Sequence, residues 1–185
     1  AGGRREDAGA EDGLRQASAV FAQDTDVWFL LGMYADRSGD SDRAIASYDR
    51  ASQSDPRDYR PFLNRGNVHF QEADYAEAIR DYDAAAQRAP RAAETSFCRN
   101  LDSPPGGQFR EQIRYLLANA KFMAANYDEA VAAYKKYLAE FPKGPNAEDV
   151  NYRIALCALF AGKYQDAMDQ LQDYVAKHPS GSFLP

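Results

Sequence analysis

The chain repeats itself with a period of 34 residues, and no other feature limits its fold as strongly. Pro56 and Pro90 lie 34 residues apart, and each follows an alanine-rich amphipathic stretch. Six positions agree between these two units: Trp28 and Phe62, Gly32 and Gly66, Ala44 and Ala78, Tyr48 and Tyr82, Ala51 and Ala85, and Pro56 and Pro90. This period is that of a helix–turn–helix unit, so we expect pairs of helices that contact mainly their neighbours.

The second half of the chain repeats the pattern with a period of 37 residues. Tyr127, Ala130, Tyr134, Tyr137 and Pro142 correspond to Tyr164, Ala167, Leu171, Tyr174 and Pro179. The three extra residues follow Pro142. We expect them to lengthen the connection or the start of the next helix rather than to break it.

The residue types at these positions suit close packing of two helices. A small residue on each first helix is expected to face an alanine on the second: Gly32, Gly66, Ala118 and Ala155 face Ala44, Ala78, Ala130 and Ala167. Small side chains allow helix axes to approach to about 8 Å. Glycine inside a helix costs roughly 0.5–1 kcal/mol against alanine, so Gly32 and Gly66 require such an approach.

These residues make the chain resemble the tetratricopeptide repeat family. The family pattern of Trp-x2-Leu-Gly, then Ala-x3-aromatic, then Pro is met by Trp28, Leu31, Gly32, Ala44, Tyr48 and Pro56. The next repeat departs from it at Arg65, where leucine is usual, and at His69, where an aromatic residue is usual. The resemblance implies an all-α fold, an α-solenoid of helix–turn–helix repeats.

The repeats predict four segments. Residues 1–24 form a flexible N-terminus and a partial repeat with its second helix only, and residues 25–90 form two 34-residue repeats. Residues 91–110 are an insertion around Ser-Pro-Pro-Gly-Gly, a turn or loop signal, and residues 111–185 form two longer repeats. The insertion is either a hinge between two repeat pairs or an exposed loop in one continuous superhelix.

Composition excludes several classes of function. With 22 basic and 28 acidic side chains the net charge is −6, which argues against nucleic acid or an anionic membrane as partner. No apolar run is long enough to insert into a bilayer. Two cysteines and two histidines leave little for a metal site, and no phosphate-binding loop, nucleophile elbow or HExxH motif occurs. We therefore expect no cofactor, no metal and no enzymatic activity.

The resemblance also implies a ligand-binding surface, because the first helices of successive family repeats line a concave groove. Carried over by motif position, the groove residues are Phe29, Met33, Arg37, Leu63, Asn67, Phe70, Tyr115, Asn119, Phe122, Tyr152, Leu156 and Phe160. Together they predict an apolar, aromatic groove suited to an extended or helical peptide. Asn67 and Asn119 are expected to hydrogen-bond the peptide backbone.

Residues 124–168 show a finer resemblance, to repeats of bacterial envelope proteins. These include the outer-membrane assembly lipoproteins and the periplasmic partner of the Tol–Pal system. The shared features are Tyr137, the break over 141–145 and the long helix start over 146–152. This resemblance implies a periplasmic location; without it, the cytoplasm is expected.

The sequence thus predicts a non-catalytic scaffold that binds a partner peptide or helix in its groove. Two other functions stay open. The chain could be a targeting or regulatory domain, cut from a larger enzyme, because both ends look truncated within a repeat array. It could also self-assemble into homo-oligomers, because uncapped terminal helices can stack between molecules.

Overall fold

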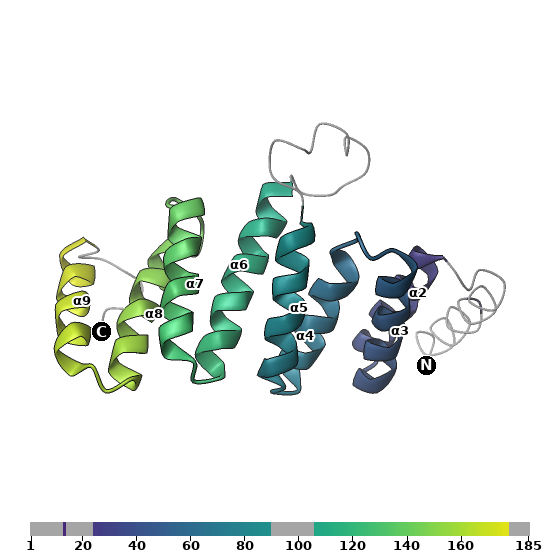
Figure 1. Cartoon of the computed structure of the whole chain (residues 1–185), viewed down its shortest axis with the longest axis horizontal. Coiled ribbons are helices and arrows are strands. Elements are labelled where there is room, and N and C mark those ends of the chain that lie inside the picture. Colours follow the sequence, from purple (N-terminus) through teal and green to yellow (C-terminus); the bar gives the residue numbers. More distant parts are fainter. Residues whose placement is uncertain (1–12, 14–23, 90–105, 178–185) are drawn as a thin grey trace, which may run out of the picture. The chain divides into compact units, whose positions relative to one another are not determined.

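The computed structural model describes residues 13, 24–89 and 106–177, and over the last two ranges it contains eight α-helices and no strand (Figure 1). The chain divides into two compact units, Ala1–Ala89 and Pro90–Pro185. The predicted all-α fold is confirmed for the described residues. The predicted partial repeat and most of the predicted insertion lie outside them.

The first unit consists of two helical hairpins. Helices α2 (Thr25–Arg37) and α3 (Ser41–Ser54) form one hairpin, and α4 (Arg60–Gln71) and α5 (Tyr75–Arg88) form the next. Helix α4 packs against both α3 and α2. This is the layout expected for two successive 34-residue repeats.

The second unit has the same layout. Helices α6 (Gly106–Met123) and α7 (Tyr127–Glu140) pair, as do α8 (Ala147–Phe160) and α9 (Tyr164–Lys177), and α7 packs against α8. Helix α6 begins at Gly106, so residues 106–110, which we assigned to the insertion, are helical.

The turn inside each hairpin follows one rule. Its residue with positive φ is Gly39, Ala73, Ala125 or Gly162, with φ between 59° and 76°. The next backbone N–H bonds a carbonyl five residues earlier, for example Asp40 to Ala35 at 2.9 Å, which closes the first helix as in a Schellman motif. In the first unit, the carboxylates of Asp40 and Asp74 then cap the second helix.

A tyrosine ring explains the two helical glycines. A Cβ at position 32 would lie 2.5 Å from the Tyr48 ring, and one at position 66 would lie 2.9 Å from the Tyr82 ring. The contact that requires glycine is therefore with the tyrosine four residues after the expected alanine. Ala44 and Ala78 are fully buried in the same hairpins.

The longer repeat in the second unit is also explained. The connection between α7 and α8 has six residues, against five between α3 and α4, and α8 has 14 residues against 12 in α4. The Tyr137 hydroxyl donates to the Glu111 carboxylate and accepts from the Asn146 N–H at 3.3 Å. Gly144 passes so close that its Cβ would lie 2.6 Å from that hydroxyl.

We expect Gly32→Ala to lower the free energy of unfolding by about 1–3 kcal/mol, because the added methyl overpacks the buried Tyr48 ring. The sign is informative, because alanine is otherwise the better helix former. Urea unfolding followed by circular dichroism measures the change.

The control is Gly162→Ala, where a Cβ meets nothing within 4 Å. Its cost is confined to positive φ, about 1 kcal/mol, and Ala73 and Ala125 already occupy this turn position in other repeats. A Gly32→Ala protein that is more stable than the parent would contradict the packing described here.

Candidate functional site

The predicted groove residues lie on the first helices of the hairpins: α2 and α4 in the first unit, α6 and α8 in the second. In the first unit, Phe29 packs between two groups. Its ring centroid lies 5.9 Å from that of Tyr48, and the Arg60 guanidinium lies 5.0 Å from the centroid on α4. Arg60 is held by Asp26 at 2.8 Å and Asp58 at 2.7 Å. Arg60 thus belongs to this surface, although the sequence pattern did not select it.

Other predicted residues of the first unit differ in accessibility. Leu63 is only 6% exposed and belongs to the core. Met33 is half-buried against the core cluster around Tyr48. Arg37, in contrast, is exposed at the end of α2. The set is therefore not a uniform apolar surface.

The two predicted asparagines hydrogen-bond within their own hairpins. Oδ1 of Asn67 accepts from the Tyr82 hydroxyl at 2.9 Å, and Oδ1 of Asn119 accepts from the Tyr134 hydroxyl at 2.7 Å. Both tyrosines are fully buried. The side-chain N–H groups of the asparagines are what they can offer to a peptide carbonyl. The 15-residue spacing of Asn and Tyr, present in both repeats, was a readable signal of this pairing.

An aromatic cluster forms where α6 and α8 end. Phe122 meets the rings of Tyr127 and Phe160, each at 5.8 Å, and Tyr127 stacks on Phe160 at 6.0 Å with 21° between the planes. Phe160 is nevertheless 57% exposed. We call Phe122, Tyr127 and Phe160 the aromatic cluster.

The third groove position is not equivalent in all four repeats. Phe70 and Phe122 lie three residues before the positive-φ residue of their turns, whereas Arg37 and Phe160 lie two before it. Phe70 packs edge-on against Tyr75 at 5.3 Å, as Phe122 packs against Tyr127.

A polar group joins α6 to α8. Both the Tyr115 hydroxyl, at 2.6 Å, and the Arg153 Nε, at 2.5 Å, donate to Oδ2 of Asp149. Burial, followed by the bond to Asp149, raises the pKa of Tyr115. Arg153 also lies 6.0 Å from the Tyr115 ring centroid. Asp149 and Arg153 were not in the predicted groove set, although their four-residue spacing on α8 places them on one face with Tyr152 between them.

The remaining predicted residues are packed in part. Tyr152 is half-buried, and its ring lies 5.8 Å from that of Tyr174 on α9. Leu156 is half-buried on α8. The side of the second unit formed by α6 and α8 thus carries Tyr152, the Arg153 guanidinium and the exposed edge of the aromatic cluster.

The densest cluster of charges lies in the first unit and links three helices. Arg65 Nε donates to Asp81 at 2.9 Å, and its other nitrogens bond Asp81 and Asp49. Asp81 is 5% exposed. His69 lies 3.9 Å from both Asp74 and Asp81. This arrangement neutralises buried charge and explains why Arg65 replaces the usual leucine.

The described residues offer little for other chemistry. Among them no group of three or more His, Cys, Asp or Glu side chains could hold a metal ion. Burial raises the pKa of Cys157 to about 11, so this side chain is a neutral thiol at physiological pH. Cys98 lies outside the described residues. In the part of the chain that is described, no helix has the length and apolar character needed to cross a membrane.

The family model for the tetratricopeptide repeat matches residues 8–59, 29–93 and 115–182. The chain belongs to the tetratricopeptide repeat family. Its all-α solenoid class is thereby confirmed, and the fold is that of a protein-interaction scaffold.

Solved structures agree with this assignment of the fold. A crystal structure of MamA protein is 16% identical, with 98% of this chain and 91% of that chain covered and a TM-score of 0.70. MamA from Desulfovibrio magneticus RS-1 is 15% identical, with coverage of 97% and 89% and a TM-score of 0.66. The Arabidopsis OM64 TPR domain is 15% identical, with coverage of 70% and 93% and a TM-score of 0.53. At these identities the likeness shows the fold alone.

We expect Arg65→Leu to lower the free energy of unfolding by about 2–4 kcal/mol, because it leaves the Asp81 carboxylate buried without its cation. The first repeat carries Leu31 and Ser47 at the two equivalent positions. The double variant Arg65→Leu/Asp81→Ser should therefore recover part of the loss, with a coupling energy of about 1–3 kcal/mol. Urea unfolding of both single variants and the double variant gives this cycle; additive effects would contradict the ion network.

Proposed function

We propose that the chain is a non-catalytic scaffold whose α6–α8 surface binds a peptide or helical segment of a partner protein. The observation that carries the proposal is the aromatic cluster, in which Phe160 is held by two rings and still 57% exposed. Rings fixed before binding lose little conformational freedom on binding, and exposed aromatic side chains are typical binding anchors.

Polar groups beside the cluster would give a bound segment direction. The side-chain N–H groups of Asn119 can donate to a peptide carbonyl, and Arg153, held by Asp149, presents a cation at the same surface. This combination favours a segment with apolar or aromatic residues and an acceptor or acidic group. The Arg60–Phe29 pair offers a similar combination in the first unit.

The compartment follows from the resemblance of the last two repeats to envelope proteins. We propose the periplasm on that basis, with the cytoplasm as the alternative. A role as targeting or regulatory domain of a larger enzyme stays a prediction from the sequence.

A displayed library of random 12-residue peptides, selected on the full chain, tests peptide binding. We expect Phe160→Ser to weaken selected peptides at least tenfold, which corresponds to 1.4 kcal/mol. Leu30→Ser is the control, because Leu30 is similarly exposed at 48% and lies outside the predicted groove. Fluorescence polarisation with labelled peptides measures both variants. Selected peptides that bind Phe160→Ser and the parent equally would contradict the proposal.

A second candidate function rests on α9. Its side chains Met168 and Val175 are 53% and 45% exposed. The equivalent side chains of α7, Val131 and Leu138, pack on the core that α7 shares with α8. The face of α9 formed by Met168 and Val175 is thus suited to cover by a further helix, which a second copy of the chain could supply.

If copies associate through this face, light scattering should show a mass that rises with protein concentration. Met168→Lys/Val175→Glu should return the chain to a monomer without loss of helicity, because charges in an apolar interface are costly. A parent chain that stays monomeric at concentrations of about 1 mM would exclude self-association through α9, since weaker contacts lie at the limit of specific binding.

A further inference from the structure

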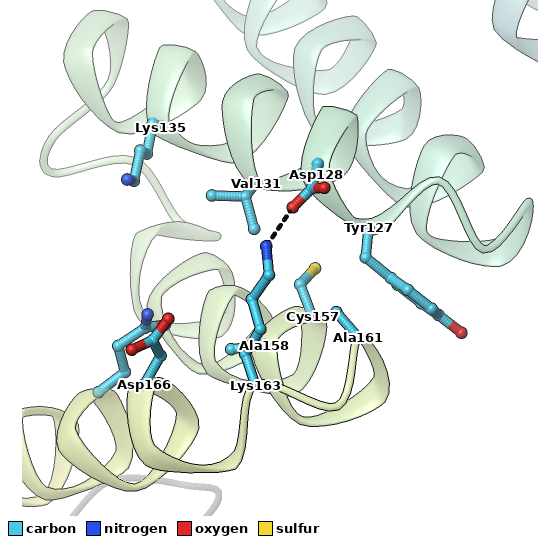
Figure 2. Close-up of a pocket in the computed structure, with 10 residues that line it drawn as sticks. Tyr127, Asp128, Val131, Lys135, Cys157, Ala158, Ala161, Lys163 and Asp166 are labelled. Atoms are coloured by element: carbon cyan, nitrogen blue, oxygen red, sulfur yellow. Dashed lines mark hydrogen bonds and ion pairs between the residues drawn. The ribbon is translucent and has the colours of Figure 1, made fainter.

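A pocket of about 200 Å³ lies on another part of the second unit, between α7 and α9 with the end of α8 as its floor. Figure 2 shows its surroundings, with Val131 on α7 and Ala158 on α8. Pockets for drug-sized ligands measure roughly 300–1,000 Å³, so this volume suits a single side chain. The aromatic cluster contributes only Tyr127 to its edge.

The pocket exists because two large side chains are missing. Ala158 lies four residues before the positive-φ residue of its turn, the position of His69 in the second repeat, and Ile154 occupies the position of Arg65. In the first unit, His69 and Arg65 occupy this position and contact Asp81. The second unit has Gln170 at the position of Asp81 and keeps the space open.

Gln170 indicates what the occupant must offer. It lines the pocket, and its Oε1 atom is buried and has no hydrogen-bond donor. A buried acceptor without a donor is unfavourable, and a donor from outside would satisfy it. At the equivalent place in the first unit, the Asp81 carboxylate receives its donor from Arg65.

The charges around the pocket indicate that the occupant is neutral. Lys135 and Lys163 line it, as do Asp128 and Asp166. Lys163 reaches across to Asp128 at 2.7 Å, as the dashed line in Figure 2 shows, while Lys135 stands apart. A cationic occupant would meet two lysines and an anionic one two aspartates, so burial of either charge is disfavoured.

We propose that this pocket binds a tryptophan side chain presented by a partner protein. The indole N–H is a donor without an acceptor, so it matches Gln170 Oε1 and leaves no acceptor of its own unsatisfied. Lysine cations are attracted to the face of an indole more than to other aromatic rings. Val131, Ala158 and Ala161 supply apolar contacts for the ring. The proposal does not depend on binding at the α6–α8 surface.

The test uses the full, ¹⁵N-labelled chain and N-acetyl-tryptophanamide as the probe. We expect saturable shifts of the backbone amides at Val131, Ala158 and Gln170, with a Kd on the order of 1 mM for an isolated side chain. The 1-methylindole analogue of the probe lacks the N–H and should bind at least threefold more weakly. Gln170→Met should bring both probes to the same affinity.

Ala158→His fills the pocket with the side chain that the second repeat carries there, and it should abolish binding. Ala132→His, at an exposed position of α7 outside the pocket, is the matched control and should bind as the parent does. If Ala158→His fails to fold, as judged by circular dichroism, Ala161→Leu narrows the same space and takes its place. Absence of saturable shifts, unchanged binding by the filled variant, or equal affinity of both probes for the parent would overturn the proposal. Stronger binding of N-acetyl-tyrosinamide than of the tryptophan probe would also overturn it.

Discussion

Contact between a buried tyrosine ring and a small residue on the paired helix underlies the three hairpins α2–α3, α4–α5 and α6–α7. Tyr48, Tyr82 and Tyr134 are fully buried, and in the first unit the ring occupies the space that a glycine leaves open. Burial raises the pKa of Tyr48 to about 12, above its ordinary value near 10. Each such hydroxyl therefore stabilises the fold below pH 10, and this contribution is lost as the pH rises through the folded-state pKa. The hydroxyls also use the carbonyl oxygens of Asn67 and Asn119.

Much of the fold could be predicted from the sequence because backbone constraints recur at a fixed spacing. Pro56, Gly32 and Gly66 act on their own helix or turn, and their effect is independent of distant residues. The groove was less predictable, because a side chain on a first helix can face a ligand or a neighbouring helix. Leu63 is in the core. A consensus pattern does not record which partner competes for each atom, and it gave no place to Arg60.

The two units show how one scaffold produces different local chemistry. In the first unit, Arg65, His69 and Asp81 fill the space beside α4 with paired charges. At the equivalent positions the second unit has Ile154, Ala158 and Gln170, and the backbone geometry of the turn is the same, with Ala73 and Gly162 both at positive φ. Exchange of three side chains therefore converts a neutralised cluster into an open pocket, without any change in the hairpin.

The hydroxyl of Tyr137 connects three segments of the second unit. It bonds Glu111 on α6 and the backbone of Asn146 before α8, while its own ring belongs to α7. Local opening of the α8–α9 hairpin would have to release this hydroxyl and expose a buried carboxylate partner at the same time. Because such linked losses make partial unfolding costly, the four helices should behave as one cooperative foldon in native-state hydrogen exchange, rather than as two hairpins that open independently.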